Sequence, residues 1–386
     1  MQRESDAIVL GLGGLGSAAA YWLARRGQSV VGLEQFELGH SNGESQDHSR
    51  IIRLSYHTPQ YVRLAQAAYA AWSELEADLG GPLIVRTGGV DLYPPGAAER
   101  SDYLTSMDAC DVPYELMDAG QAMLRWPEFR LDADVEACFQ AESGIAPAAL
   151  CNAAHQRMAR QHGALLVEHA GVTGIEAGGG EVEVTAGGDR YRAARLVIAA
   201  GPWTNGALGH LGFELPLTVT QEQVTYFQTD AAGAFAPDRF PIWIWMGDPC
   251  FYGFPVYGEQ AVKAAWDAGG AETTAETRSF DPNPENARAV REFVERTIPR
   301  AAGPELYTKT CLYTMPPDRD FILDTLPGHP EIALAVGAGH AFKFACVIGR
   351  IMSDLALGGD CADDLSPFRF DRPILHERAP EKNFRI

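Results

Sequence analysis

Three glycines near the N-terminus have the spacing found in sites that bind a pyrophosphate. The apolar run AIVL (7–10) leads directly into GLGGLG, which supplies Gly11, Gly13 and Gly16. In this pattern the first glycine allows a tight turn, the second lets the backbone approach the pyrophosphate, and the third lets a helix pack closely on a strand. The helix that follows directs its positive N-terminal end at the anion. The predicted chemistry is binding of a phosphorylated ligand.

Glu34 indicates what else that ligand contains. A second apolar run (30–33) follows the predicted helix and ends at Glu34, 18 residues past Gly16. An acidic side chain at this point accepts hydrogen bonds from an adenosine ribose. The order strand, glycine turn, helix and strand therefore predicts an ADP-containing cofactor, and it does not separate FAD from NAD.

A second glycine-rich turn lies near the C-terminus. In AVGAGHAFKFACVIGR (335–350), Gly337 and Gly339 follow an apolar run and precede an apparent helix. A helix N-terminus here would stabilise negative charge on a ligand ring. Lys343 follows the turn, and two interpretations remain open. Either its charged end reaches solvent from a helix end, or it contacts a ligand that the glycine turn allows to come close.

The seven cysteines form no metal or disulfide pattern. They are odd in number and scattered from Cys110 to Cys361 without a C-x-x-C pair, so neither a zinc site nor a disulfide framework is predicted. Most are expected to be buried thiols that pack as small hydrophobic side chains. Cys311, in KTCLYTMPPDRDF (309–321), fits that description too, and its neighbours alone leave its role open.

Composition narrows the class of protein. The chain has 386 residues, of which 46% are hydrophobic and 21% charged, as in globular proteins of two or three domains. A formal net charge of −20 without a long basic run argues against a nucleic-acid partner, so an anionic substrate needs a local cationic pocket. No apolar run approaches the roughly 20 residues that span a membrane. The N-terminus does not resemble a secretory signal, which predicts a cytoplasmic protein.

The elements that position these residues follow two patterns. Strand–helix–strand segments occur at the N-terminus, around 150–205 and near the C-terminus, and strand-like stretches such as 218–228 lie between them. Residues 60–76 carry apolar side chains at helical spacing. The expected fold class is α/β (α+β), with a Rossmann-like cofactor domain interleaved with a sheet-lined substrate domain. We assign residues 1–85, 150–215 and 305–386 to the first and residues 86–149 and 216–304 to the second.

Five ordered motifs resemble one family of enzymes. GLGGLGSAAAYWLARRG, HSNGESQDHSRIIRLSY, FYGFP, TCLYTMPPDRDFILD and GAGHAFKF together resemble the monomeric sarcosine oxidase and N-methyltryptophan oxidase family across nearly the whole chain. The resemblance implies a monomeric flavoenzyme with FAD attached through a cysteine thioether. The matching cysteine is Cys311.

The resemblance also implies roles for individual residues. Arg50 matches an arginine beside the flavin that assists its attachment, and Lys263 matches a lysine on the face where oxygen is reduced. Arg53 and Lys343 match a pair that grips the substrate carboxylate. The sequence neighbours of Lys263 alone would suit a surface lysine. Further substrate contacts are expected at Tyr252, which is also a catalytic candidate, and at Tyr313, Gly339 and Asp267.

The expected cofactor contacts extend along the chain. They are Gly11, Gly13, Gly16, Glu34, Ser41, Ser49, Arg50, Val172, Ala200, Gly201, Trp203, Cys311, Gly339, His340 and Lys343. No metal site is expected. The chain departs from the sarcosine oxidase branch at Asp267, where that branch has a histidine, and at Ser49, where it has a threonine. Trp243 and Trp245 are expected near the pocket wall or in the core.

The implied reaction is oxidation of a secondary amine α to a carboxylate, giving an imine while O₂ becomes H₂O₂. An oxidase or dehydrogenase for cyclic imino acids is the alternative, which Asp267 favours if its carboxylate faces the pocket. An NAD-linked reductase that uses only the N-terminal glycines is a further alternative, as is a flavin-binding sensor without turnover. No G-x-S-x-G or H-E-x-x-H motif supports a hydrolase.

Overall fold

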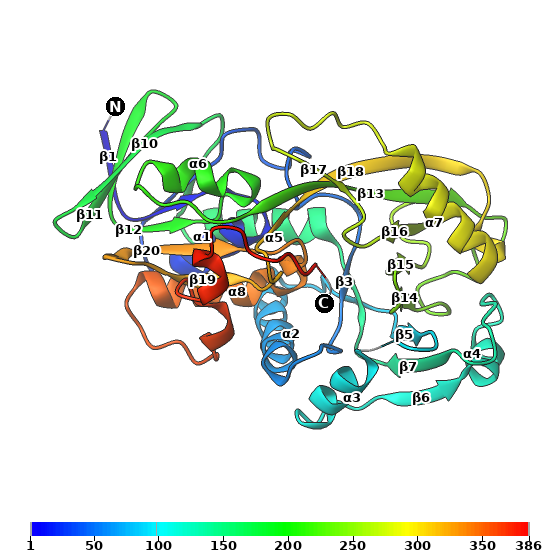
Figure 1. Ribbon diagram of the computed structural model, residues 1–386. Helices are drawn as coiled ribbons and strands as arrows, with labels where there is room; N and C mark the ends of the chain where they lie inside the picture. Colours follow the sequence, from blue (N-terminus) through cyan, green and yellow to red (C-terminus); the bar gives the residue numbers. More distant parts are fainter. Residues whose placement is uncertain (1, 98, 385–386) are drawn as a thin grey trace.

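A computed structural model of the chain describes residues 2–97 and 99–384. Figure 1 shows two large sheets side by side, with the N-terminus at the left edge and the C-terminus near the centre. The eight-stranded first sheet has the order β10-β11-β12-β1-β2-β9, with β20 beside β12 and β19 beside β20. Its strands are β1 (Gln2–Leu10), β2 (Val30–Leu33), β9 (Leu165–Val167), β10 (Val172–Gly178), β11 (Glu181–Ala186), β12 (Asp189–Ile198), β19 (Ile322–Leu326) and β20 (His329–Val336).

The centre of the first sheet is parallel and buried on both faces. β1 runs parallel to β2 and to β12, and β12 runs parallel to β20. Successive side chains of a strand point to opposite faces, so Ala7 and Val9 join one hydrophobic cluster while Ile8 and Leu10 join another. Helix α1 (Gly14–Arg25) packs against α5 (Ala148–Gln161) and α8 (Ala345–Ala356). The predicted α/β fold is confirmed here.

The glycine turn joins β1 directly to α1. Gly11 has a φ of +85°, which a residue with a side chain rarely adopts. A Cβ on Gly16 would lie 1.8 Å from the carbonyl oxygen of Gly11, so only glycine lets the helix approach the strand end this closely. These two positions need glycine for the turn and the packing that the sequence predicted.

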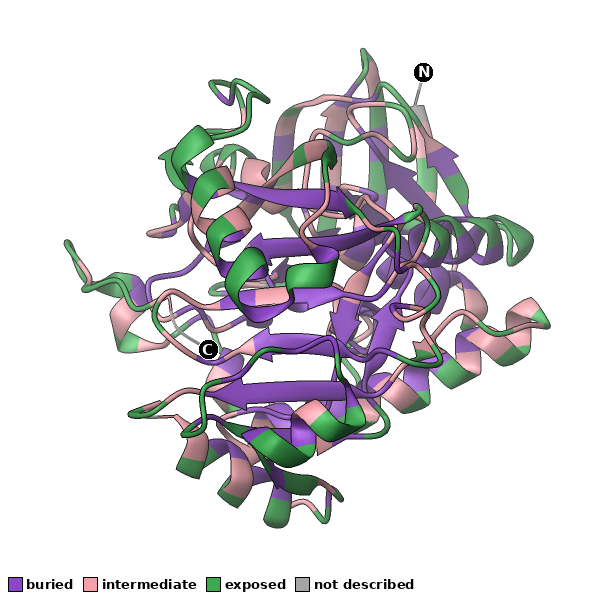
Figure 2. Cartoon of the chain, turned by 90° about the vertical axis from the view of Figure 1, so that its right-hand side faces the viewer, coloured by how far each residue is buried: buried purple, intermediate pink, exposed green. Residues whose placement is uncertain are grey.

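The nine-stranded second sheet has the order β17-β13-β16-β15-β14-β5-β7-β6, with β18 on the other edge of β13. Figure 2 shows the central strands of this sheet mostly buried, with helices carrying exposed residues in front of them, whereas the edge strands β6 and β17 are mostly exposed. Phe293 of α7 (Pro284–Thr297) stacks on Trp243 and on Phe251 of this sheet. The strands are β5 (Gly89–Tyr93), β6 (Glu115–Asp118), β7 (Glu136–Gln140), β13 (Thr218–Gln228), β14 (Ile242–Trp245), β15 (Phe251–Phe254), β16 (Ala261–Trp266), β17 (Ala271–Thr273) and β18 (Glu305–Met315).

The remaining elements connect and cover these sheets. A three-stranded sheet consists of β3 (Arg50–Ile52), β8 (Gly144–Ala146) and β4 (Val85–Arg86). The expected helix at 60–76 is α2 (Pro59–Leu79), and α3 (Arg100–Asp108), α4 (Ala119–Arg125) and α6 (Thr204–Gly209) are shorter. Short 3₁₀ helices span Gly201–Trp203, Pro299–Ala301, Ala341–Phe344, Ser366–Phe368 and Pro373–His376. Within the described ranges, none of the helices combines the length and apolar character needed to cross a membrane.

One segment lies in a different sheet from the one its assignment suggests. Residues 305–315 form β18, which pairs with β13 in the second sheet, although the sequence assigns 305–386 to the cofactor domain. The long strand β13 already pairs with β16 and β17 along one edge. Its other edge needs partners for its backbone groups, and β18 supplies them. The two-domain division, with 305–386 as the third cofactor segment, stays a proposal.

Candidate active site

A cavity of about 420 Å³ is bounded by residues of both large sheets. This volume lies within the range of small-molecule sites. Its wall includes the glycine turn after β1 and the second glycine turn after β20. It also includes four cationic side chains, which are Arg50, Arg53, Arg319 and Lys343. In a chain of net charge −20, so many cations in one cavity indicate a site for an anionic ligand.

The first glycine turn forms a cradle in the cavity wall. Gly11, Gly13 and Gly14 line it, and a Cβ on Gly13 would come within 3.0 Å of Ser45 Oγ. The backbone N–H of Gly14 donates to Ser45 Oγ at 2.8 Å. Gly13 at the start of α1 has no capping side chain, so the helix end is open to an anion. These residues fit the pyrophosphate of a dinucleotide.

Glu34 lines the same part of the cavity. Its carboxylate accepts hydrogen bonds from the N–H groups of Leu12 and Phe36 at 2.9 and 3.1 Å, and His40 Nε2 lies 3.4 Å away. Burial raises the pKa of Glu34, but His40 and the two backbone donors outweigh it and hold the pKa below its usual value. An ionised carboxylate in this position suits a ribose hydroxyl.

The other expected cofactor residues divide into two groups. Val172, Ala200, Gly201 and Trp203 line the cavity near Glu34, and Gly339, His340 and Lys343 line it at the second turn. Outside the lining lie Gly16, Ser41, Ser49 and Cys311, and among these Ser41 is exposed.

Arg50 connects the cavity wall to the loop before it. Its Nη2 donates to the carbonyls of Glu44 and Gln46 at 3.0 and 2.8 Å, and its Nη1 donates to the Ser49 carbonyl at 3.0 Å. These bonds fold the loop around the guanidinium, which lines the cavity. The arrangement presents a fixed positive charge to a bound ligand.

Cys311 lies on β18, two residues before Tyr313. Residues two apart share a face of a strand, and Tyr313 lines the cavity. Cys311 is partly buried, and all seven cysteines are unpaired. Burial raises the pKa of the Cys311 thiol to about 11, and the nearby Arg50 acts in the opposite direction. Arg50 is thus the strongest local influence favouring a thiolate.

Arg53 and Lys343 lie close together in the wall. Arg53 is 7% exposed, its Nη1 lies 3.5 Å from Asp91 Oδ1, and its guanidinium lies 5.0 Å from the Tyr56 ring centroid. Its Nε and Nη1 have no hydrogen-bond partner among the described residues. Burial and then the Arg53 charge lower the pKa of Lys343 to about 7. Because Arg53 and Lys343 both line the cavity, the pair is suited to an incoming anion.

Two tyrosines and a glycine complete this part of the wall. Tyr252, Tyr313 and Gly339 all line the cavity. A Cβ on Gly339 would come within 2.5 Å of the Tyr313 ring, so glycine permits the turn to pack against that ring.

Asp267 lines the cavity, but its carboxylate is not free. Arg319 Nη1 and Nη2 each lie 2.9 Å from one of its oxygens, and Tyr313 OH donates to Oδ1 at 3.4 Å. Burial raises the pKa of Asp267, but Arg319, Lys343 and Arg53 outweigh it, so the pKa stays below its usual value. The expected carboxylate is present, and an arginine offsets its charge.

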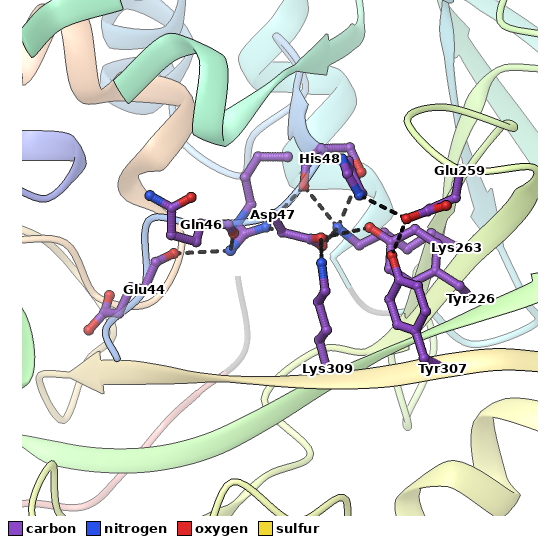
Figure 3. Close-up of polar contacts among 11 residues, drawn as sticks. Glu44, Gln46, Asp47, His48, Tyr226, Glu259, Lys263, Tyr307 and Lys309 are labelled. Atoms are coloured by element: carbon purple, nitrogen blue, oxygen red, sulfur yellow. Dashed lines mark hydrogen bonds and ion pairs between the residues drawn. The ribbon is translucent and has the colours of Figure 1, made fainter. Parts of the chain in front are cut away.

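Lys263 lies outside the cavity lining, in the network shown in Figure 3. Its Nζ lies 2.6 Å from Asp47 Oδ2 and donates to the Ser49 carbonyl at 2.9 Å. Asp47 also accepts from Tyr226 OH at 2.8 Å and from Lys309 Nζ at 3.4 Å. Lys263 is 2% exposed, so it is not a surface lysine. Burial lowers its pKa to about 8, although Asp47 opposes this.

Trp243 and Trp245 do not line the cavity. Side chains alternate along β14, so Trp243 and Trp245 pack against Phe293 of α7, whereas Ile244 and Met246 line the cavity. The expectation of tryptophans at the pocket wall is wrong, and the alternative that they belong to the core is confirmed.

Sequence reasoning missed several residues of the site. Ser45, Tyr56 and Arg319 line the cavity, and Asp47 binds Lys263. Arg319 lies in the motif that contains Cys311, which was the available signal. Asp47 carried a weaker signal, because it lies in the loop motif that contains Arg50.

A cavity that joins a dinucleotide cradle to several buried cations is characteristic of dinucleotide-dependent oxidoreductases that act on small anions. The model of a family described as FAD dependent oxidoreductase matches residues 6–355. The chain belongs to this family, which identifies the cofactor as FAD rather than NAD. The glycine cradle and Glu34 fit that cofactor.

Named relatives are similar over nearly the full length. Monomeric sarcosine oxidase of Streptomyces avermitilis is 34% identical over 95% of this chain and 97% of its own. N-methyl-L-tryptophan oxidase of Salmonella arizonae is 33% identical over 95% of this chain and 98% of its own. A solved structure of NikD, described as an unusual amino acid oxidase essential for nikkomycin biosynthesis, superposes with a TM-score of 0.85 at 27% identity, covering 95% of this chain and 97% of that one.

Proposed function

We propose that the protein oxidises an amino acid with a secondary amine, such as sarcosine or another N-methyl amino acid, to the imine, with O₂ reduced to H₂O₂. The observation that carries the proposal is the pair of cations Arg53 and Lys343 in the wall of the FAD cavity. The names of the sarcosine and N-methyltryptophan oxidases support the substrate class.

Arg53 and Lys343 would hold the substrate carboxylate. Arg53 lines the cavity with its guanidinium, and charge-assisted hydrogen bonds are about twice as strong as neutral ones. Tyr252 would add a neutral donor from β15. Fixing the carboxylate positions the amine and the adjacent carbon, so that binding contributes orientation to the reaction.

FAD, when bound, would supply the redox chemistry that couples oxidation of the C–N unit to reduction of O₂. The pyrophosphate would be held by Gly11, Gly13 and the start of α1, and Glu34 would bind the ribose. The Cys311 sulfur would attach to the flavin as a thioether by replacing a hydrogen on a ring methyl carbon. The two electrons released would pass to the flavin itself and from it to O₂, two protons would leave, and Arg50 would assist by favouring the thiolate. The location of Cys311 on the same strand face as Tyr313 supports this attachment.

Lys263 would serve the oxygen half-reaction. O₂ gains negative charge as it is reduced, and a fixed ammonium stabilises such charge without reorganisation of solvent. Asp47 and the Ser49 carbonyl hold the ammonium in one place, which is the preorganisation that this role requires. The imine product would leave and hydrolyse in water.

Oxidation of a cyclic imino acid is the second candidate. It is favoured by Asp267, whose carboxylate lies in the cavity wall where the sarcosine oxidase branch carries histidine. The same carboxylate grip would serve both substrate classes.

We further propose a monomeric, cytoplasmic protein.

Acid precipitation of the purified protein tests the cofactor and its linkage. Yellow colour in the pellet is expected for the wild type, and colour in the supernatant for Cys311→Ala. Cys250→Ala is the matched control, because Cys250 also contributes to the cavity wall, and its colour should stay in the pellet. A colourless protein that takes up no added FAD would refute the proposed function.

A peroxide assay tests the substrate class. Sarcosine, other N-methyl amino acids, proline and pipecolate would be supplied to the air-saturated holoenzyme. Peroxide formation with the acyclic compounds supports the main proposal, and turnover confined to the cyclic ones supports the second candidate. Absence of flavin reduction by every member of the panel under anaerobic conditions would refute both.

A further inference from the structure

The Asp267–Arg319 pair is oriented so that the carboxylate faces the cavity and the guanidinium lies behind it. Both residues line the cavity, yet the side chain of Asp267 is 24% exposed and that of Arg319 only 1%. Arg319 Nη1 also donates to the Phe384 carbonyl at 2.5 Å, and the Arg319 carbonyl contacts His340 Nε2 at 3.1 Å. Backbone and side chain of Arg319 are therefore both fixed, and the arginine holds Asp267 in one orientation.

Asp267 keeps acceptor capacity after these contacts. A carboxylate offers about four lone-pair positions. Oδ1 accepts from Arg319 and Tyr313, while Oδ2 accepts from Arg319 alone among the residues that the structure describes. The nearby cations keep the group ionised, so it can accept a hydrogen bond from a ligand but is not suited to donate one.

The cavity therefore offers cations for a carboxylate and, separately, an anionic acceptor. Arg53, Lys343, Arg319 and Asp267 all line one cavity. Within it, Arg319 contacts Asp267, and the Arg319 carbonyl contacts His340, three residues before Lys343. An amino acid whose carboxylate lies against Arg53 and Lys343 has its nitrogen one carbon away. Asp267 is the ionised acceptor in the cavity wall that lies in this neighbourhood.

We propose that Asp267, held by Arg319, is a specificity-determining residue that accepts a hydrogen bond from the N–H of the bound amine. This inference rests on the proposed function and deepens it. The site selects amino acids that retain an N–H, whether acyclic or cyclic, and rejects tertiary amines such as N,N-dimethylglycine. The ion pair with Arg319 offsets the charge of Asp267, which limits its preference for the unreactive ammonium form.

Two planar ligands of nearly the same shape test the proposal without turnover. Pyrrole-2-carboxylate carries a ring N–H, and 2-furoate carries a ring oxygen in its place. Binding of each to the holoenzyme is followed by the change in the flavin absorption spectrum. Because an ionised acceptor left unpaired is costly, pyrrole-2-carboxylate should bind about 10- to 100-fold more tightly.

Paired substitutions assign the discrimination to Asp267. Asp267→Leu combined with Arg319→Met removes both charges, so no buried charge is left alone. In this double variant, the preference for pyrrole-2-carboxylate over 2-furoate should fall below about threefold. Asp267→Asn is the milder variant, and its preference should fall by about tenfold. Arg86→Met with Glu142→Leu removes an exposed ion pair away from the cavity and should leave the preference unchanged.

The outcomes separate this inference from the function on which it rests. Equal binding of the two ligands by the wild type would overturn the role of Asp267 and leave the carboxylate grip standing. The role of Asp267 would also be overturned if both Asp267 variants kept the full preference for pyrrole-2-carboxylate over 2-furoate. If neither ligand binds, the carboxylate grip fails, and the inference fails with it.

Discussion

Lys343 is a half-buried cation whose charge is lost near neutral pH. Its pKa is lowered to about 7 by burial and by Arg53, so the ammonium is present below that pH and is lost as the pH rises through it. A bound carboxylate favours the ammonium and raises the pKa again. Binding of an anion above pH 7 should therefore take up a proton.

The affinity for 2-furoate measures this effect, because the compound has no amine that titrates. We expect the affinity to be constant well below pH 7 and to fall by up to tenfold per pH unit above it. Lys343→Met should bind at least about tenfold more weakly, with little dependence on pH. Lys382→Met, which removes an exposed lysine paired with Glu272, should keep the wild-type profile. A flat wild-type profile between pH 6 and 9 would contradict the prediction.

Lys263 should affect only the oxygen half-reaction. Lys263→Met is expected to leave anaerobic reduction of the flavin by substrate within about twofold of wild type and to slow reoxidation by O₂ about 100-fold or more. Lys309→Met is the matched control, because Lys309 contacts the same carboxylate from an exposed position. Stopped-flow absorbance resolves both half-reactions. Equal slowing of both by Lys263→Met would exclude the proposed role.

Residue types in the site were largely predictable, whereas their pairing was not. Arg53, Lys343 and Tyr252 line the cavity, and the substrate contacts that the resemblance implied for them stay predictions. The sequence could not show that Arg319, 52 residues after Asp267, neutralises it. A pair this far apart along the chain depends on how β18, which leads to Arg319, pairs with β13 in the second sheet, and no local pattern encodes that pairing.

At the scale of elements, alternation along β14 explains the one wrong assignment of side chains. The run IWIWM is apolar throughout, so hydrophobicity alone does not distinguish its two faces. Helix α7 covers the face with the tryptophans, and the cavity lies on the other. A strand buried on both faces gives no polar side chain from which the orientation could be read. The parallel unit around β1 was predictable because three glycines at this spacing, between an apolar run and a helical pattern, are characteristic of it.

The close contact between α1 and β1 leads to a prediction about stability. In Gly16→Ala the new methyl group would meet the Gly11 carbonyl, and overpacking of this kind costs about 1–3 kcal/mol. The added methyl group would push α1 away from the end of β1 and so displace the glycine cradle. The FAD content should therefore fall together with the unfolding temperature. Gly209→Ala, where nothing lies within 4 Å of the added Cβ, should change neither. Thermal unfolding and the flavin-to-protein absorbance ratio test this, and normal FAD content in Gly16→Ala would contradict it.

At the scale of the whole molecule, the cofactor cavity connects the two large sheets. Its wall combines the turns after β1 and β20 with side chains from β14, β15 and β18. A ligand that contacts both sheets stabilises the folded chain as a unit, because it binds the native state and not the unfolded chain. The form of that stabilisation depends on whether the ligand can dissociate.

A covalent link through Cys311 predicts that the stability of the wild type is independent of free FAD. A dissociable cofactor adds RT ln(1 + [FAD]/Kd), or about 1.4 kcal/mol for each tenfold increase in its concentration. We therefore expect a constant unfolding temperature for the wild type and for Cys250→Ala as FAD is added. The unfolding temperature of Cys311→Ala should rise steadily with FAD and be lowest after dialysis. Differential scanning fluorimetry across a hundredfold range of FAD measures both. A wild-type unfolding temperature that rises with FAD as steeply as that of Cys311→Ala would show that β18 does not hold the flavin through its cysteine.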